Sequence, residues 1–398
     1  LPVTSIFWLT FCPQPVSKRL GVVPDEEEAT MSRRLGLFFF FLTLFACLGF
    51  LARVAFLETV QAKTTSRVLP PASYEGLALY PVVAASWPST EDYLTLDEGL
   101  QTGQVVVSEV GGEILRRSRD SWPLPIQGGG AQVNRLALLN HSKKRLILLA
   151  GEIVSGGKQD RVIAKDRLVA PEGEPLPLDV FCVEHGRWTG ASYQFHAVEL
   201  MAHPKLRQEV AVAKDQAKVW AEVSGEDRVA GGSGGGLATS TATVEAVARS
   251  GTAAYTSIAK DARSRRHIEP FADELDRRFK QATAGLKQER VVGVVVAYGG
   301  ELAWADVFAS PALFERYWSK LLRSYVVEAL NRPKPKEAAP EVARAQEFLT
   351  PLRGSEKSES EPDLYRTTEI SERGYAQFEL IALGKSPLEL HFNKLRKE

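Results

Sequence analysis

The sequence predicts an α+β fold, in which a β-rich antiparallel, sandwich-like N-terminal half packs with a C-terminal half of helices plus a hairpin. Short apolar, β-branched runs separated by turn residues fill residues 76–184, a pattern typical of antiparallel strands. Apolar residues then recur at helical spacing over residues 204–223. Farther on, Gly299-Gly300 joins the β-branched run of residues 291–298 to a second run over residues 302–308, which predicts a tight hairpin.

The expected elements of the N-terminal half are mostly strands. Pro81 interrupts the first of them, which indicates an edge strand or a bulge because proline lacks the N–H that a central strand needs. Thr95 is expected to cap a short helix over residues 95–103. The expected strands are residues 76–85, 104–110, 133–139, 145–154, 161–169 and 178–184.

The C-terminal half is expected to combine amphipathic helices with a few strands. Ser310-Pro311 precedes the helix with the broadest apolar stripe, which should cover one face of the sheet. Residues 353–363 are charged and are interpreted as a loop. The expected helices are residues 204–223, 268–286, 312–330 and 341–349, and the expected strands are residues 291–298, 302–308, 374–383 and 388–392.

The first part of the chain carries an export pattern. Residues 1–30 precede a methionine and are interpreted as an upstream extension that is not translated. Residues 31–62 contain a basic start, an apolar run over residues 35–57 and a small-residue site ending at Ala62. This pattern is typical of a signal peptide, and the length of the apolar run also allows an uncleaved membrane anchor. Either alternative places the rest of the protein outside the cytoplasm, in the periplasm or the extracellular space.

The remainder is expected to be one domain. Residues 63–73 are short and polar and are interpreted as a tether. Residues 74–396 form the expected domain, with a flexible insertion over residues 224–243 that is rich in glycine and serine. Basic and acidic residues each number 49, and this balance argues against a nucleic-acid partner, which would need a basic face.

Cysteine usage limits the chemistry of this domain. Of the three cysteines, only Cys182 lies beyond the export segment, so no disulfide is expected within the domain. A single thiol on an alternating strand is more typical of a small buried apolar side chain than of a nucleophile. The histidines show no pair at helical metal-ligand spacing, and neither a metal nor an organic cofactor is expected.

Polar residues gather where the strands of residues 145–188 end. Two acids, two arginines and an aromatic residue lie beside glycines there, which is more than a fold alone needs. The candidate catalytic carboxylates are Glu152 and Glu184, and the candidate ligand-binding residues are Gly156, Gly157, Lys158, Gln159, Arg161, Arg187 and Trp188.

Two interpretations of these residues remain open. The acids and arginines form either a buried ion-pair network that fixes the sheet register or a polar pocket at the strand ends. Likewise, the N–H groups of Gly156 and Gly157 together with Lys158 form either an anion-binding nest or a plain hairpin turn.

Two segments are distinctive, GEIVSGGKQDR over residues 151–161 and CVEHGRW over residues 182–188. They resemble the bacterial domain family named for its association with ARG-type proteins, taken as ADP-ribosylglycohydrolases, and with rhodanese-like phosphatases. The likeness continues over residues 291–330 and, more weakly, over 345–349 and 389–392. The resemblance implies a domain and its associations and does not specify a reaction.

Two functions from different classes follow. The first is an exported binding module that holds a small anionic or polyol ligand with the candidate ligand-binding residues. Arginine suits phosphate and carboxylate because its planar fork binds two oxygens, and Trp188 would stack on the ligand. The alternative is a hydrolase in which Glu152 and Glu184 are paired, one kept protonated by the charge of the other. For that alternative, the resemblance implies an ADP-ribose-like or phosphorylated substrate.

Overall fold

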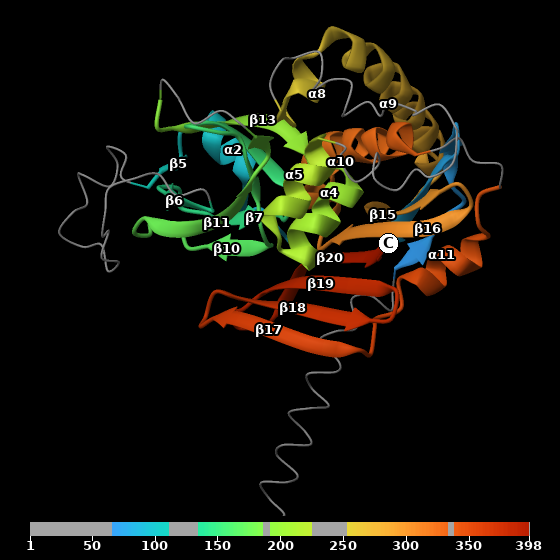
Figure 1. Ribbon diagram of the computed structural model, residues 1–398. Coiled ribbons are helices and arrows are strands. Elements are labelled where there is room, and N and C mark those ends of the chain that lie inside the picture. Colours follow the sequence, from blue (N-terminus) through green and yellow to red (C-terminus); the bar gives the residue numbers. More distant parts are fainter. Residues whose placement is uncertain (1–65, 111–133, 186–191, 225–252, 333–337, 398) are drawn as a thin grey trace, which may run out of the picture. The chain divides into compact units, whose positions relative to one another are not determined.

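The computed structural model describes residues 66–110, 134–185, 192–224, 253–332 and 338–397. All of them belong to one compact unit of the chain. They combine antiparallel sheets with helices, so the predicted α+β class is confirmed (Figure 1). Among the described residues, no helix is long and apolar enough to span a membrane. The export segment over residues 31–62 and residues 225–243 of the expected insertion lie outside the described residues.

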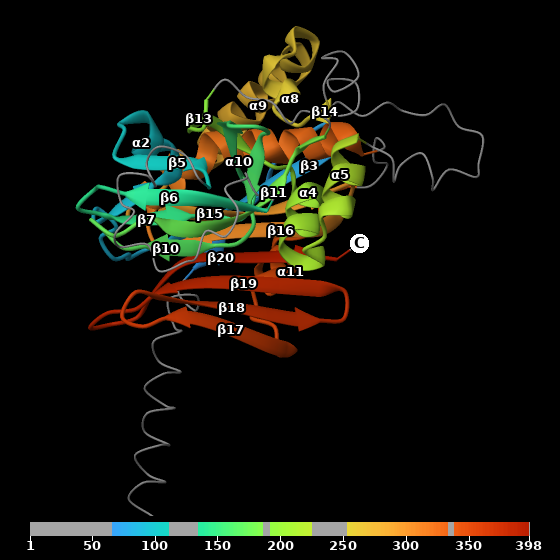
Figure 2. The same cartoon turned by 60° about the vertical axis from the view of Figure 1, so that its left-hand side comes forward.

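A nine-stranded sheet forms the larger part of the structure. Figure 2 shows its strands β15, β16, β20, β19, β18 and β17 side by side in this order, and β1 to β3 complete the sheet next to β15. All of its strand pairs are antiparallel. The strands are β1 (Arg67–Val68), β2 (Ala72–Tyr74), β3 (Leu77–Ala84), β15 (Arg290–Tyr298), β16 (Glu301–Phe308), β17 (Ser355–Glu361), β18 (Tyr365–Glu372), β19 (Tyr375–Ala382) and β20 (Leu388–Arg396).

Helices cover both faces of this sheet. Helices α9 (Ala262–Thr283) and α10 (Pro311–Asn331) pack on one face, and α11 (Val342–Phe348) packs on the other. Side chains alternate along a strand, so Leu79 of β3 joins the core beneath α9 and α10, whereas Tyr80 joins the core beneath α11.

The second part is a smaller β structure with barrel-like closure. Its six-stranded sheet has the order β13-β8-β9-β11-β6-β5. Ser108 of β5 also forms a bridge with Gln194, and the N–H of Glu109 donates to the carbonyl of Tyr193 at 2.8 Å, so the first and last strands meet. The strands are β5 (Val105–Glu109), β6 (Arg135–Asn140), β8 (Glu152–Gly156), β9 (Arg161–Ile163), β11 (Leu176–Cys182) and β13 (Phe195–Met201).

Shorter elements complete this part. Helix α2 (Leu96–Gln101) has Thr95 as its N-cap, as predicted, and Glu98 closes a capping box. A three-stranded sheet has the order β10-β7-β4, and a two-stranded sheet pairs β12 with β14. These strands are β4 (Tyr93–Thr95), β7 (Arg145–Leu148), β10 (Arg167–Val169), β12 (Glu184–His185) and β14 (Ala253–Ala254), and helix α8 (Ser257–Lys260) precedes α9.

The hairpin predicted over residues 145–169 is present, but each of its strands bends and changes sheet. Strand β7 pairs with β10, whereas β8 pairs with β9. At the bend, the N–H groups of Leu149 and Ala150 donate to the side chains of Glu152 and Asp166 at 2.7 Å instead of to a neighbouring strand. Gly151 has a φ of 96°, which glycine adopts without strain. The predicted strands 145–154 and 161–169 were therefore too long.

The helix predicted over residues 204–223 is also interrupted. It consists of α4 (Pro204–Gln208), a π-helical turn η2 (Glu209–Ala213) and α5 (Gln216–Ser224). Lys214 lies between the last two with a φ of 53°, a left-handed conformation that ends the π-helical turn. Short π-helical turns are often found at functional sites.

Two further expectations are wrong. Residues 67–68 and 72–74 are strands, so the tether expected over 63–73 does not extend through this part. Residues 355–361 form the edge strand β17, where alternating charged side chains conceal the strand pattern. The two predicted halves also interleave, because β3 pairs with β15 in the C-terminal sheet.

Pro81 does not mark an edge strand, because β3 has neighbours on both sides. Its carbonyl accepts from the N–H of Leu69 at 2.9 Å. In an antiparallel strand, the N–H and the carbonyl of one residue point to the same side. An N–H at position 81 would therefore point toward the gap between β1 and β2, where no strand would accept its hydrogen bond. The irregularity in pairing falls instead on the partner strand, between Val291 and Gly293.

Candidate functional site

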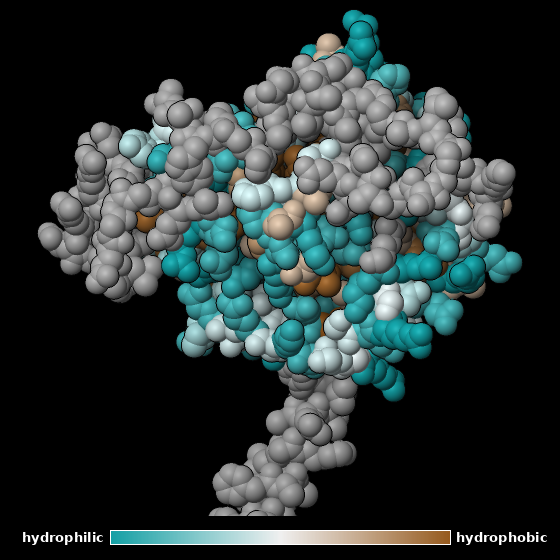
Figure 3. Space-filling model, viewed as in Figure 1, coloured by the Kyte–Doolittle hydropathy of each residue, from teal (hydrophilic) through white to brown (hydrophobic). Residues whose placement is uncertain are grey.

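A pocket of about 470 Å³ lies beside the bends of the central hairpin. Strands β16 to β20, strand β11, helix α4 and the turn η2 all contribute to its walls. Figure 3 shows a mostly hydrophilic face with a small patch of hydrophobic atoms near the lower ends of α4 and α5. The apolar lining residues are Ala150, Ala164, Phe181, Val210, Ala211, Trp304 and Phe378.

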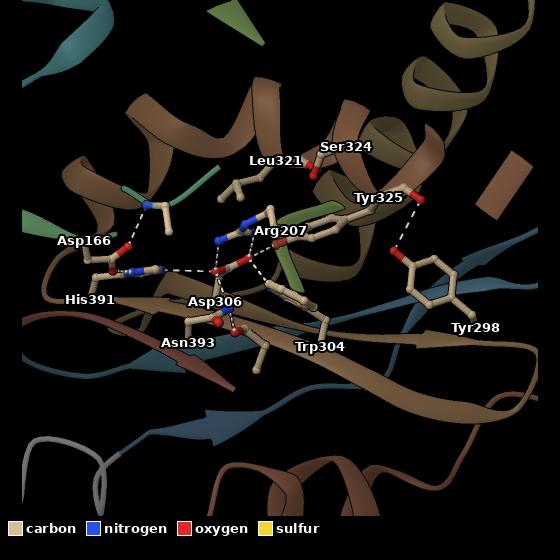
Figure 4. Close-up of polar contacts among 12 residues, drawn as sticks. Asp166, Arg207, Tyr298, Trp304, Asp306, Leu321, Ser324, Tyr325, His391 and Asn393 are labelled. Carbon is tan, nitrogen blue, oxygen red and sulfur yellow. Dashed lines mark hydrogen bonds and ion pairs between the residues drawn. The ribbon is translucent and has the colours of Figure 1, made fainter. Parts of the chain in front are cut away.

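A buried carboxylate, that of Asp306, organises the floor of this pocket (Figure 4). Side chains alternate along a strand, so Trp304 and Asp306 share one face of β16, and His391 and Asn393 share one face of the neighbouring β20. Asp306 accepts hydrogen bonds from Arg207 at 2.9 and 3.0 Å, and it also accepts from the side chains of Trp304, Tyr325, His391 and Asn393. Burial alone would raise the pKa of Asp306, but Arg207 and His391 lower it well below its usual range.

His391 lies between two carboxylates. Its Nδ1 is 2.5 Å from Oδ2 of Asp166, and its Nε2 is 3.1 Å from Oδ1 of Asp306. Carboxylates accept hydrogen bonds, so both ring nitrogens donate and the imidazole is charged. Burial alone would lower the pKa of His391, but the two carboxylates outweigh it and raise the pKa to about 9. The group Asp166, His391, Asp306 and Arg207 is therefore a balanced set of charges.

Arg207 is held from both sides. Its guanidinium carbon lies 4.7 Å from the ring centre of Trp304, within reach of a cation–π interaction. A Cβ at Gly151 would be only 2.5 Å from Cγ of Arg207, so the arginine side chain can pass only over a glycine. The bend in the hairpin and the position of Arg207 thus depend on the same residue.

Ion pairs connect the walls of the pocket. Lys165, at the second bend of the hairpin, lies 2.8 Å from both carboxylate oxygens of Glu359 in β17. Lys214, after η2, lies 2.8 Å from Glu369 in β18. Both lysines are partly exposed, so these contacts are surface ion pairs of small energy.

The two candidate catalytic carboxylates do not line this pocket. Glu152 is buried, and its oxygens contact Nζ of Lys320 at 2.5 Å and the N–H of Leu149 at 2.7 Å. Burial raises the pKa of Glu152, and Lys320 opposes this. Glu184 is also buried and accepts from the N–H of Asp160 at 3.1 Å. Each acid is therefore engaged in contacts inside the protein.

Gln159 and Arg161 are also turned inward. Arg161 is fully buried, and its Nη1 donates to the carbonyl of Gln159 at 2.7 Å. Its Nη2 lies 3.7 Å from Glu109. The thiol of Cys182 donates to the side-chain oxygen of Gln159 at 2.8 Å, and burial raises the pKa of this thiol. Arg161 thus pairs with Glu109, and Glu152 pairs with Lys320, so their partners differ from the acids and arginines of the expected network.

The backbone N–H groups of the glycine loop donate to carboxylate and carbonyl oxygens of the protein itself. The N–H of Gly156 donates to Asp160 at 3.2 Å, and that of Lys158 donates to Glu109 at 2.9 Å. The N–H of Gly157 donates to the carbonyl of Gln194 at 3.3 Å. The backbone N–H groups of this loop, predicted to form an anion-binding nest, are therefore occupied. Arg187 and Trp188 lie outside the described residues.

Sequence reasoning did not identify Asp166, Arg207, Asp306 and His391. A signal existed, because Asp306 and His391 interrupt strands that are otherwise apolar and should be buried. A charged residue at such a position needs a partner. Among the described residues, no group of histidine, cysteine and acidic side chains is arranged to hold a metal ion.

Comparison with family models gives one match. Residues 65–386 match the ARG and Rhodanese-Phosphatase-superfamily-associated Protein domain. The chain belongs to this family. The resemblance recognised in residues 151–161 and 182–188 is confirmed. No curated protein and no solved structure matches the chain. The match to the ARG and Rhodanese-Phosphatase-superfamily-associated family covers the smaller six-stranded sheet, every strand of the large sheet except β20, and every residue of the pocket except Asn393.

Proposed function

We propose that this domain is a binding module for a small anionic or polyol ligand, which it holds in the pocket beside the bends of residues 145–188. The observation that supports this most directly is the combination of apolar walls with a fixed polar floor. Ligand pockets in proteins measure about 300–1,000 Å³ and combine apolar lining with a few well-placed polar groups. The pocket here, at about 470 Å³, falls in that range.

The polar floor supports binding because it is held in position before any ligand arrives. Asp306 is fully buried and bonded on both oxygens. Asp166 and Asn393, which reach the pocket, are bonded to His391 and Asp306 respectively. Little side-chain entropy would therefore be lost when a ligand binds.

The hydrolase alternative lacks support in this geometry. Its mechanism required Glu152 and Glu184 to face a common substrate, and neither lines the pocket. Glu152 is buried, and its oxygens contact Lys320 and the N–H of Leu149, so they do not face a substrate. Binding without hydrolysis is therefore the function that we propose.

We also propose that binding takes place outside the cytoplasm. The apolar run over residues 35–57 and the small-residue site ending at Ala62 support export. N-terminal sequencing of the protein from cell fractions tests this. A mature form that starts at Lys63 outside the inner membrane is expected, retention from Met31 in the membrane would support the anchor, and soluble cytoplasmic protein would contradict both.

A pocket-filling variant tests the binding function. Ala164 lines the pocket and is only partly buried, so Ala164→Phe should fill it and leave the fold intact. Ala312→Phe, on the exposed side of α10, is the matched control. Thermal unfolding is followed with a panel of neutral sugars, sugar phosphates, inorganic phosphate and uronates.

The expected result is that at least one compound stabilises the wild type and Ala312→Phe, and leaves Ala164→Phe unaffected. A ligand at about one hundred times its dissociation constant stabilises the folded state by about 2.7 kcal/mol. Stabilisation of all three proteins to the same degree would place binding elsewhere and contradict the proposal.

A further inference from the structure

We infer that the pocket takes a neutral, polyhydroxylated ring compound of the sugar class, and that it discriminates against phosphorylated and other anionic compounds. This inference rests on the proposed binding function and narrows its ligand. Two observations support it: most of the charged groups that line the pocket are paired, and aromatic side chains form part of its wall.

Three of the four cations that line the pocket, Arg207, Lys165 and Lys214, are paired with carboxylates. Both terminal nitrogens of Arg207 donate to Asp306. The remaining Nε of Arg207 is buried, so a ligand cannot reach it. Lys165 and Lys214 are each bound to a glutamate on the opposite wall. A phosphate that bound Lys165 or Lys214 would have to displace the glutamate, and exchanging one exposed ion pair for another gives little net gain.

Carboxylates outnumber cations around the pocket. The acidic lining residues are Asp166, Asp179, Glu359, Glu369 and Glu379, and the basic ones are Lys165, Arg207, Lys214 and Lys357. Of the basic residues, Lys357 alone forms no side-chain ion pair within the described part of the chain. Five acidic and four basic side chains leave one net negative charge in the lining, so the pocket as a whole offers an anion no net attraction. Ionised carboxylates are acceptors only, and the hydroxyl groups of a polyol are suitable donors to them.

Aromatic residues supply flat apolar surfaces for the other side of such a ring. Phe181 projects from β11 and Phe378 from β19, and both are only partly buried. Trp304 forms part of the floor, and its indole N–H donates to Asp306 at 2.9 Å, which fixes the ring. A sugar presents a C–H face that packs on an aromatic ring and an edge of hydroxyl groups for polar partners. The pocket offers both surfaces together.

The test compares neutral and charged forms of the same ring. Glucose, maltose and myo-inositol are titrated by calorimetry alongside glucose 6-phosphate, glucuronate, inorganic phosphate and choline. At least one neutral compound should bind, and its phosphorylated or oxidised form should bind at least tenfold more weakly. Binding of the neutral compound should change less than twofold between about 0.05 and 0.5 M salt, because screening acts on charges.

Two variants measure how much an aromatic side chain of the pocket contributes to the binding affinity. Phe378→Ala should weaken the binding of the neutral compound about tenfold, which corresponds to about 1.4 kcal/mol. Tyr375→Ala is the matched control, because Tyr375 is also partly buried on β19 but packs on the other side of the sheet against Phe348. This control should bind as the wild type does.

The possible results distinguish failure of the inferred ligand class from failure of the proposed binding function. Tighter binding of glucose 6-phosphate, phosphate or glucuronate, abolished by Ala164→Phe, would overturn the inference of a neutral sugar and leave the proposed binding function standing. Tighter binding of choline, abolished by the same variant, would overturn both, because choline is neither an anion nor a polyol. Failure of every compound to bind in a manner sensitive to Ala164→Phe would overturn both.

Discussion

Arg207 in α4 and Asp306 in β16 face each other through two hydrogen bonds, 2.9 Å from Nη1 to Oδ2 and 3.0 Å from Nη2 to Oδ1. This arrangement is the bidentate geometry in which arginine binds a carboxylate best. It connects the segment before η2 to the centre of the large sheet, directly beneath the pocket. The pocket therefore depends on a buried charge pair that must form for the walls to meet.

Removing the charge of Asp306 should destabilise the protein strongly. In Asp306→Asn, the guanidinium of Arg207 stays buried without its counterion, which costs about 3–5 kcal/mol. Urea unfolding of wild type and variant measures this. Glu289→Gln is the control, since it breaks the exposed pair between Arg67 and Glu289 at 2.5 Å and should cost less than about 1 kcal/mol. Similar losses in both variants would show that burial of the Arg207 pair does not matter.

Stability should fall as the pH rises above neutrality. The pKa of His391 is 6.5 in its ordinary state and is raised to about 9 in the fold, where the carboxylates of Asp166 and Asp306 outweigh the effect of burial. A raised pKa means that the charged form stabilises the fold. This contribution is complete below pH 6.5 and is lost as the pH rises through about 9.

The free energy of unfolding from urea titrations at several pH values between about 6 and 9.5 measures this loss. His391→Gln should be less stable at neutral pH and should show a much smaller decline. His141→Gln is the control, because His141 is exposed and should leave the decline unchanged. A wild type whose stability is constant over this range would contradict the charged state of His391.

Gly151 should tolerate alanine less well than another glycine with a similar backbone. Gly151 and Gly103 have φ values of 96° and 70°, so alanine is strained at both, by about 1–2 kcal/mol. Only at Gly151 would the new Cβ also meet Arg207, at 2.5 Å, whereas nothing lies within 4 Å at Gly103. Urea unfolding should show a larger loss for Gly151→Ala than for Gly103→Ala. Equal losses would mean that Arg207 moves aside at no cost.

Elements with strong local signals could be predicted from the sequence. The Thr95 cap, the Gly299-Gly300 turn and the Ser310-Pro311 helix start all occur as expected. Each depends on the chemistry of a few neighbouring residues, such as a hydroxyl that accepts a backbone N–H. Such signals do not depend on the rest of the fold.

The bends of the central hairpin could not be predicted in the same way. The apolar runs of residues 145–154 and 161–169 continue through the bends, so their pattern gives no sign of a change of sheet. The bends are stabilised by Asp166, which accepts from Ala150 and contacts His391, a residue 225 positions away. Contacts over such separations arise from the fold as a whole.

The candidate site shows the same limit. Glu152, Arg161 and Glu184, which the sequence singled out, are buried, and the ion-pair partners of the first two, Lys320 and Glu109, come from other parts of the chain. The pocket depends on a different set. Arg207 and Asp306 are 99 residues apart, and they come from elements whose pairing the sequence did not reveal.

The thiol of Cys182 should be unreactive in the folded protein. It is fully buried, burial raises its pKa, and only the thiolate is nucleophilic. In a chain that carries Cys12→Ser and Cys47→Ser, a thiol-specific disulfide reagent should react with Cys182 only after urea is added. Rapid stoichiometric reaction without urea would show that this thiol is accessible.

The network around Arg161 should act on stability and leave the pocket unaffected. Arg161 is fully buried, so Arg161→Leu leaves Glu109 without its ion pair and should cost about 3 kcal/mol. Arg396→Leu is the matched control, because it breaks an exposed pair with Glu301 and should cost less than about 1 kcal/mol. Urea unfolding measures both.

Calorimetric titration with the compound that binds the wild type most tightly should then give the same affinity for Arg161→Leu, since Arg161 does not line the pocket. A stable Arg161→Leu variant that has lost this affinity would restore Arg161 as a ligand-binding residue and place the site at the glycine loop.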